Sequence, residues 1–133
     1  PETQPILMRL ESDLVEAIEA SIQGRTSEGD FRWSPDASVC VVMSSGGYPG
    51  TFEAGKRIDG LEDAAKIEGV KVFHAGTSKR DGAYYTAGGR VLGVTARARD
   101  LQTAVARAYE GCDKILFDGA HYRKDIAARA LRK

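Results

Sequence analysis

Apolar residues recur at three- and four-residue intervals along the first part of the chain, and this spacing predicts an amphipathic helix from about Thr3 to Gln23. The apolar stripe of this helix would consist of Leu7, Leu10, Leu14, Ile18 and Ile22. Such a stripe has to be buried, so we expect the helix to pack against another part of the protein. The polar residues 25–30 that follow are typical of a linker or turn.

From Phe31 onward the pattern changes to short strands. The β-branched run Ser38–Met43 predicts a buried strand, and Phe31–Trp33 alternates between apolar and polar positions. A hairpin turn is expected over Ser78–Gly82, where Asp81-Gly82 is the strongest local turn signal. Further strands are expected at Val70–Ala75, Ala83–Thr86, Arg90–Ala96 and Ile115–Phe117.

A second long helix is expected after Asp100, which suits the N-cap, and Gly111 would end it. A single helical turn is expected within Leu61–Ile67, and a short C-terminal helix after the charged loop 122–126. The predicted fold class is therefore α+β. It would be a small antiparallel sheet or barrel-like arrangement with one packed helix, preceded by a helix that belongs to a different domain.

Length and composition exclude several classes of protein. The 133 residues fit one domain, or one small domain with an appended element, and 42% hydrophobic against 29% charged residues excludes wholesale disorder. Nineteen basic residues balance nineteen acidic ones, so no overall basic field favours nucleic acid. No apolar run approaches the roughly 20 residues of a membrane span. Cys40 and Cys112 match no metal-binding spacing, and we expect a cytoplasmic protein.

The charge is distributed unevenly along the chain. Residues 1–36 hold three basic and eight acidic side chains, a net of −5, whereas residues 37–133 hold sixteen and eleven, a net of +5. Two parts with different surroundings are therefore expected. Because the chain opens at Pro1 and runs almost directly into a helix, we expect a piece of a longer chain, with N-terminal processing as the alternative.

Three local features are candidates for binding an anion. Ser44–Gly50 (SSGGYPG) is a glycine-rich loop that can bring backbone N–H groups close to a ligand, or an ordinary glycine turn. Gly88-Gly89-Arg90 pairs a flexible backbone with a guanidinium suited to phosphate, or forms a bulge followed by a surface arginine. Residues 122–125 (YRKD) form either a cationic clamp or a solvated charge cluster.

Catalytic motifs are missing from the sequence. It has no P-loop, zinc-protease motif, nucleophile elbow or paired carboxylates, and we expect His74 and His121 to be structural. From the residues alone, the prediction is an anion-binding α+β module without a complete catalytic apparatus.

At these same positions the sequence resembles a known family. The segments PETQP (1–5), SSGGYPG (44–50), VFHAGT (72–77), GGRVLGVTA (88–96) and YRKDI (122–126) occur in order. Together they resemble the C-terminal third of the phosphoribosylamine–glycine ligases, which are also called glycinamide ribonucleotide synthetases and are ATP-grasp enzymes of purine biosynthesis. The resemblance extends over essentially all 133 residues.

The resemblance implies an activity and a domain division. In this family, ATP, glycine and 5-phosphoribosylamine give glycinamide ribonucleotide, ADP and phosphate, with Mg²⁺ as the metal and Mn²⁺ as an alternative. Residues 1–30 would be the tail and linker of the ATP-grasp domain, and residues 31–133 the C-terminal domain. The family's metal ligands and ATP-binding elements lie upstream of the PETQ motif. We therefore expect no metal site here and no product from this chain alone.

The resemblance also implies a set of site residues. Arg90 would face the substrate phosphate, beside the backbone of Gly88 and Gly89. The further candidates are Arg123 and Lys124 for the phosphate, Glu2, Thr3 and Gln4 near the sugar or the transferred group, and Ser45, Gly46, Gly47 and Tyr48 as part of the pocket wall.

Some positions depart from the family pattern, and one alternative function stays open. Ala87 stands where relatives commonly carry Asn, Ala127-Ala128 where Gly-Trp is common, and His121 where Phe is frequent. The alternative is a stand-alone, non-catalytic module that binds a phosphorylated metabolite or another domain. Binding of nucleic acid by the +5 part is disfavoured by the zero net charge of the whole chain.

Overall fold

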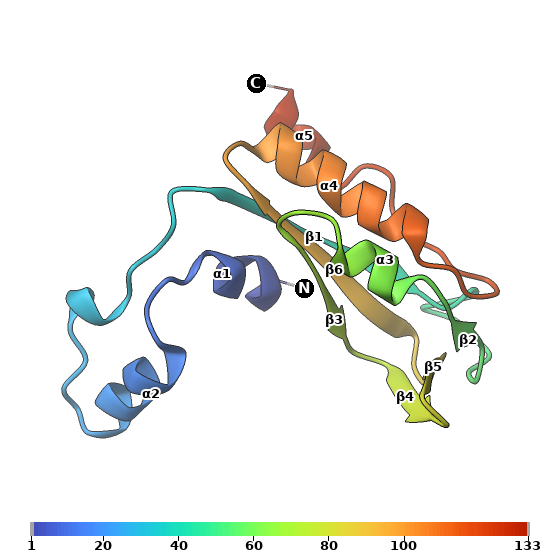
Figure 1. The fold of residues 1–133 in the computed structure, drawn as a ribbon, viewed down its shortest axis with the longest axis horizontal. Coiled ribbons are helices and arrows are strands. Elements are labelled where there is room, and N and C mark those ends of the chain that lie inside the picture. Colours follow the sequence, from blue (N-terminus) through green and yellow to red (C-terminus); the bar gives the residue numbers. More distant parts are fainter. Residues whose placement is uncertain (1, 133) are drawn as a thin grey trace.

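A computed structural model describes residues 2–132, and its main body is an antiparallel sheet between helices (Figure 1). The sheet has the order β1-β6-β3 and is formed by β1 (Ala37–Ser44), β6 (Arg90–Ala98) and β3 (Val70–His74). A second small sheet has the order β2-β5-β4, from β2 (Arg57–Ile58), β5 (Ala83–Thr86) and β4 (Thr77–Arg80). The predicted α+β class with a small antiparallel sheet is confirmed.

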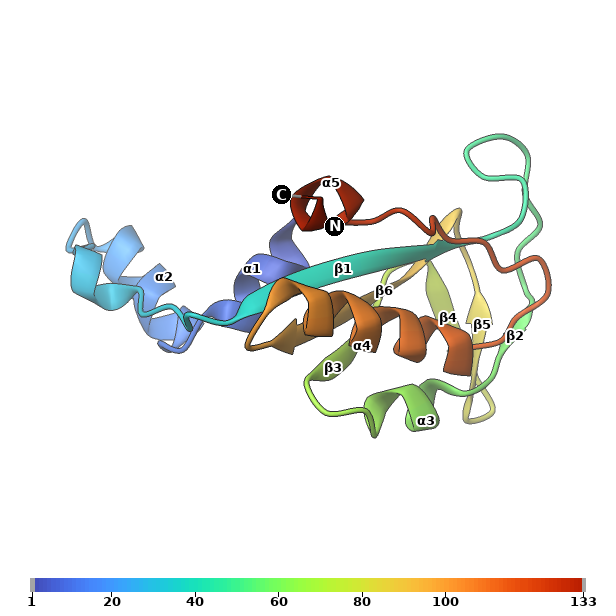
Figure 2. The same cartoon turned by 90° about the horizontal axis from the view of Figure 1, so that it is seen from above.

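Helices cover the two faces of the main sheet. The long helix α4 (Leu101–Lys114) packs on β1 and β6 from one side, and α1 (Thr3–Arg9) packs on the same strands from the other, as Figure 2 shows. Because both faces are covered, β6 is buried along almost its whole length. The short α3 (Leu61–Ala65) lies against α4 and β3, and α5 (Ala128–Leu131) ends the described chain.

The hydrophobic core fills the space between the main sheet and α4. Side chains with little or no exposure include Val41, Val94, Ala104, Ala108 and Cys112. Asp100 is the N-cap of α4, as predicted, because its carboxylate accepts from Thr103 N at 2.8 Å. The prediction that Gly111 ends this helix is wrong: α4 continues to Lys114, and Gly111 lies where a Cβ would be 2.8 Å from Cγ1 of Val94.

The predicted single helix from Thr3 to Gln23 is wrong, because the chain forms two helices, α1 and α2 (Leu14–Ile22). Between them Leu10 is extended and pairs with Trp33, and Glu11 N donates to Arg32 O at 2.8 Å. Asp13 then caps the new helix, with its carboxylate accepting from Val15 N at 2.7 Å. Local backbone pairing and a strong N-cap thus outweigh the continuous apolar period.

The break separates α2 from the sheet, as Figure 1 shows at the left of the molecule. Its apolar side remains open: Leu14 is 40%, Ile18 49% and Ile22 80% exposed. A short 3₁₀ helix, η1 (Glu28–Asp30), then leads the chain back toward β1. The expectation that this stripe is buried is therefore not met within residues 2–132.

Most of the remaining strand predictions differ only in their bounds. The hairpin turn is confined to Asp81-Gly82, both with positive φ, and residues 77–80 form β4 rather than part of the turn. Instead of a strand, the run Ile115–Phe117 contributes one isolated bridge, between Leu116 and Asp59.

Candidate functional site

Arg90 stands at the first position of β6, where the pairing with β1 changes register. Met43 pairs with Leu92, whereas Ser44 pairs with Arg90, so Val91 is an extra residue on β6. Side chains alternate between the two faces along a regular strand. Without the extra residue, the side chain of Arg90 would therefore lie on the same face of the sheet as Leu92, the face that α4 covers. The bulge instead places Arg90 opposite Ser44, on the sheet face that α1 covers.

Four of the residues predicted from the sequence line one cavity on this face. The cavity has a volume of about 610 Å³, and the four are Gln4, Tyr48, Gly89 and Arg90. They come from α1, the loop after β1, and the start of β6. The rest of the wall is formed by Cys40, Val42, Phe52, Ala75, Gly76, Leu92 and Gly93. The fold thus brings the PETQ, SSGGYPG and GGR segments together around a single space.

A second cavity adjoins the first one and shares part of its wall. It measures about 310 Å³, and Val42, Tyr48 and Arg90 line both cavities. The remainder of its wall is formed by Ser44, His121, Tyr122 and Arg123. Arg90 and Arg123 therefore border one mostly apolar space. A guanidinium in such surroundings binds an anion more strongly than it does in open water.

The side chain of Gln4 lines the first cavity, and its amide oxygen is buried without a hydrogen-bond partner. Among the described residues, its Oε1 and Thr95 Oγ1 are the buried side-chain atoms without a hydrogen-bond partner. Leaving a buried acceptor unpaired costs about 1–3 kcal/mol.

The glycines of the Ser44–Gly50 loop are required by the packing of the chain itself. Gly47 has a φ of 90°, and a Cβ there would be 2.1 Å from Thr51 O. A Cβ on Gly46 would stand 2.9 Å from Gly119 O. Ser45 is 3% exposed, and its hydroxyl donates to Gly88 O at 2.9 Å. These three residues line neither cavity and instead fix the shape of the loop that carries Tyr48.

Hydrogen bonds with Tyr109 attach the YRKD segment to α4. Tyr109 Oη donates to Arg123 O at 2.8 Å and accepts from Ile126 N at 3.1 Å. Arg123 makes a two-point ion pair with Asp125, with contacts of 2.9 and 2.7 Å, and the hydrogen bond from Arg123 holds the pKa of the Asp125 carboxyl below its usual range. The sequence pattern alone did not indicate this role for Tyr109.

The other predicted residues lie outside the two cavities. Lys124 Nζ donates to Tyr122 Oη at 3.0 Å, and this bond raises the pKa of Lys124. The Tyr122 hydroxyl in turn donates to Asp113, which raises the pKa of Tyr122. Glu2 and Thr3 stand at the exposed start of α1, just ahead of Gln4. Gly88 lies beside the cavity wall, against Gly76.

Several residues that line the cavities were not site candidates in the sequence, among them Cys40, Phe52 and Gly76, and His121 was expected to be structural only. Gly76 belongs to the VFHAGT motif, so a signal was available for it. His121 pairs with Ser44 through both backbone groups, which brings its side chain to the second cavity. No local pattern marks Cys40 or Phe52, because only their tertiary positions bring them to the site.

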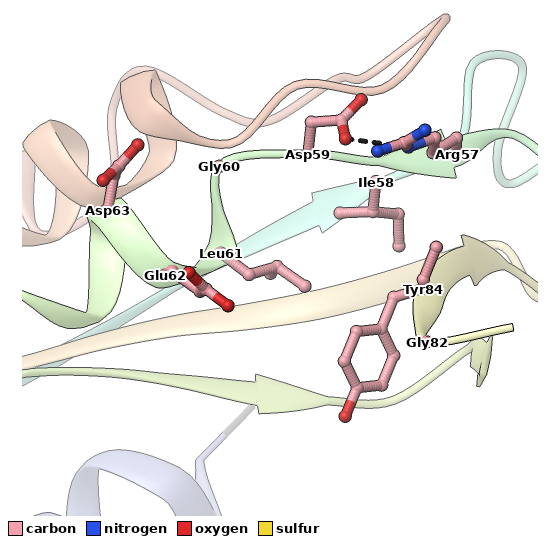
Figure 3. Close-up of a pocket in the computed structure, with 10 residues that line it drawn as sticks. Arg57, Ile58, Asp59, Gly60, Leu61, Glu62, Asp63, Gly82 and Tyr84 are labelled. Atoms are coloured by element: carbon pink, nitrogen blue, oxygen red, sulfur yellow. Dashed lines mark hydrogen bonds and ion pairs between the residues drawn. The ribbon is translucent and has the colours of Figure 1, made fainter. Parts of the chain in front are cut away.

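A further cavity, of about 390 Å³, lies away from all of these residues, between β2–α3 and the β4–β5 turn (Figure 3). Three of its charged groups already have partners: Arg57 Nε lies 2.9 Å from Asp59 Oδ1, as the dashed line in Figure 3 marks, and Asp63 pairs with Lys66 at 2.7 Å. We therefore assign the candidate site to the two cavities around Arg90.

Residues 2–132 contain neither a cluster of metal ligands nor a membrane-spanning helix. No group of three or more His, Cys, Asp or Glu side chains in this range could hold a metal ion. No helix in the same range has the length and apolar character needed to cross a bilayer.

The main sheet, its packed helix and the small second sheet define an α+β domain with an arginine-lined cavity. The family described as "Phosphoribosylglycinamide synthetase, C domain" matches residues 38–129. The phosphoribosylamine–glycine ligase of Rhodopirellula baltica is 48% identical over 132 residues, which are 98% of this chain and 30% of that protein. The chloroplastic enzyme of Arabidopsis thaliana is 47% identical over 100% of this chain and 25% of its own length.

A solved structure agrees with these relationships. The crystal structure of phosphoribosylamine–glycine ligase from Thermotoga maritima superposes with a TM-score of 0.78 at 31% identity, over 94% of this chain and 30% of that one. The chain belongs to the phosphoribosylglycinamide synthetase C-domain family. It spans between a quarter and a third of the length of these relatives.

Proposed function

We propose that this chain is the C-terminal part of a ligase that joins glycine to 5-phosphoribosylamine, with conversion of ATP to ADP and phosphate, in de novo purine biosynthesis. The family match and the names of the relatives support the reaction. The observation that carries the proposed role of this chain is the convergence of Arg90 and Gln4 on one cavity of about 610 Å³.

In the proposed reaction, a glycine carboxylate oxygen attacks the terminal phosphorus of ATP, and ADP leaves. The amine of phosphoribosylamine then attacks the carbonyl carbon of glycyl phosphate, so that an amide forms, phosphate leaves and the nitrogen loses a proton. This chain contributes binding and orientation. The planar guanidinium of Arg90 donates two parallel hydrogen bonds to the substrate phosphate.

Around that phosphate the other residues have separate tasks. The backbone of Gly88 and Gly89 lies beside it, and Arg123, paired with Asp125, borders the adjoining cavity as a second guanidinium for the phosphate. Gln4, on the same cavity wall as Arg90, lies near the ribose or the reacting amine. Glu2 and Thr3 stand next to Gln4, and Lys124 beside Arg123 extends the cationic edge.

The ATP and metal sites belong to the preceding part of the longer polypeptide in this proposal. ATP with Mg²⁺, or with Mn²⁺ in its place, would be bound there. By itself, therefore, this chain forms no glycinamide ribonucleotide. Residues 1–30 would complete the ATP-grasp domain, residues 31–133 would form the C-terminal domain, and the whole enzyme would act in the cytoplasm on small molecules, with no role for nucleic acid.

The apolar side of α2 is the proposed contact with that ATP-grasp domain. Leu14, Ile18 and Ile22 lie on one face of the helix and are between 40% and 80% exposed. Burial of apolar surface is favourable by about 25 cal/mol per Å². A face of this kind therefore favours a partner domain within the same polypeptide.

A second candidate is a free-standing module that binds a phosphorylated metabolite. The observation in its favour is that residues of this chain alone enclose the cavity around Arg90. The mass of the native polypeptide that contains these residues distinguishes the two. A mass several times 14.3 kDa favours the ligase, and a mass near 14.3 kDa favours the module.

Binding is tested by titrating the ¹⁵N-labelled chain with ribose 5-phosphate, which keeps the phosphate and sugar of the substrate. We expect chemical-shift changes at Gln4, Tyr48 and Gly88–Arg90, and none at the Asp81-Gly82 turn. Ribose without the phosphate serves as the matched control and leaves the spectrum unchanged. Shift changes that avoid Arg90, or none at all, would contradict the proposed site.

A further inference from the structure

Three successive carbonyl groups around Arg90 are held by hydrogen bonds from neighbouring loops. Gly88 O accepts from the Ser45 hydroxyl at 2.9 Å, and Gly89 O accepts from Ser45 N at 2.8 Å. Arg90 O accepts from Gly76 N at 2.8 Å. Ser45 thus supplies two of these three donors, and its hydroxyl is the one donor of the three that belongs to a side chain.

This segment needs to be held because its backbone is intrinsically free. Two adjacent glycines precede Arg90, and glycine loses more conformational freedom on ordering than any other residue. Ordering the backbone of one residue costs about 1–2 kcal/mol. Ser45 is 3% exposed, so water cannot readily replace its hydroxyl as the partner of Gly88 O.

The hydrogen bonds of Ser45 also adjoin the bulge that orients Arg90. Ser44 pairs with Arg90 across the bulge, and Ser45 is the next residue along the chain. A shift of one residue in this pairing would return Arg90 to the opposite face of the sheet, away from the cavity. The contacts of Ser45 with Gly88 and Gly89 oppose that shift because they fix the two residues that enter β6.

We propose that Ser45 is a positioning residue: its buried hydroxyl fixes the Gly88–Gly89 backbone so that Arg90 presents its guanidinium to the cavity. This role differs from the place in the pocket wall that the family resemblance implied for Ser45. It rests on the proposed function of Arg90 as the phosphate ligand. Functional groups held in place before binding bind more tightly, because less entropy is lost when the ligand arrives.

The test compares Ser45→Ala with Ser38→Ala in the 133-residue chain. The Ser38 hydroxyl donates to Ala96 O at 3.1 Å, so the control removes a serine hydrogen bond to the same strand, β6, at its other end. We expect the dissociation constant for ribose 5-phosphate, measured by calorimetry, to rise about tenfold in Ser45→Ala and by less than about twofold in Ser38→Ala.

A second measurement separates positioning from a general loss of stability. ¹⁵N relaxation of the Arg90 Nε–Hε group reports the order of the guanidinium on the picosecond-to-nanosecond timescale. We expect the order parameter of this group to fall in Ser45→Ala and to stay at the wild-type value in Ser38→Ala. If Ser45→Ala does not fold, Ser45→Cys replaces it, since a thiol is close to the hydroxyl in size but a weaker donor.

The outcomes distinguish this inference from the proposed function. If the wild-type chain does not bind ribose 5-phosphate, the proposed phosphate site fails. If the wild type binds and the two alanine variants bind equally well, with equal order at Arg90 Nε, the positioning role of Ser45 is wrong. The positioning role is supported if Ser45→Ala binds ribose 5-phosphate more weakly than the wild type and if the order at Arg90 Nε falls in Ser45→Ala but not in Ser38→Ala.

Discussion

The ring of Tyr48 lies directly against the backbone of Gly89: a Cβ at position 89 would stand 2.2 Å from Cδ2 of Tyr48 and 2.7 Å from its Cε2. The same Cβ would be 3.2 Å from Cε1 of Phe52. Tyr48 lines both cavities beside Arg90, so this close approach sets the position of their shared wall. Gly89 is required here for its lack of a side chain and not for an unusual φ.

Gly89→Ala is therefore expected to displace the Tyr48 ring and weaken ligand binding while the sheet stays folded. The dissociation constant for ribose 5-phosphate should rise about tenfold or more, measured by calorimetry. Gly29→Ala is the control, because a Cβ there meets its nearest atom, Ser27 Oγ, at 3.7 Å. Equal affinities for the two variants would mean that Tyr48 does not shape the site.

Cys40 provides a chemical probe of the cavity. Its side chain lines the same wall as Arg90, and burial raises the pKa of its thiol. Because the thiolate is the nucleophile, alkylation by iodoacetamide should be slow at pH 7, quicken as the pH rises toward 9, and slow again with ribose 5-phosphate bound.

Cys112 is the internal control for this labelling. It is 1% exposed, and burial raises the pKa of its thiol to about 12. It should react only in denaturant, so mass spectrometry of the native protein should find one label per chain. Labelling of Cys40 at the same rate with and without ribose 5-phosphate would show that the ligand does not occupy this cavity.

Ala127 adopts a backbone conformation that suits glycine. Its φ is 63°, and left-handed backbone costs roughly 1–2 kcal/mol for a residue with a Cβ. Ala127→Gly should therefore raise the free energy of unfolding by about 1 kcal/mol and the Tm by about 3–4 °C. Ala130→Gly, within α5, should lower stability by up to about 1 kcal/mol, because helical φ favours alanine. Thermal unfolding followed by circular dichroism measures both, and a lower Tm for Ala127→Gly would contradict this assignment.

Local patterns predicted most of the secondary structure but not its interruptions. The β-branched run before Ser44 and the N-cap at Asp100 mark β1 and α4 because strand and helix periodicity reflect burial on one face. The apolar period from Leu7 to Ile22 gave the wrong result for a physical reason: pairing of Leu10 with Trp33 and capping by Asp13 stop the helix. The pairing joins residues far apart in the sequence, and a local hydrophobic pattern carries no information about such contacts.

The candidate site was predictable as a set of motifs and not as an arrangement. The glycine-rich loop and Gly-Gly-Arg indicated an anion, but the orientation of Arg90 depends on the extra residue Val91 in β6, which no local signal marks. The meeting of Gln4 with Arg90 depends on the packing of α1 on the sheet. Both are consequences of tertiary pairing, as is the hydrogen bond of Ser45 with Gly88.

The central claim is that Arg90 binds the phosphate of phosphoribosylamine, and steady-state kinetics of Arg90→Ala in the ligase that contains this chain tests it most directly. A charge-assisted contact is worth about 1.5–3 kcal/mol, so the KM for phosphoribosylamine should rise roughly 10- to 150-fold. The KM for ATP should stay near its wild-type value, and so should both constants in Arg80→Ala, where the guanidinium stacks on Tyr85 in the β4–β5 hairpin. An unchanged KM for phosphoribosylamine in Arg90→Ala would contradict the account.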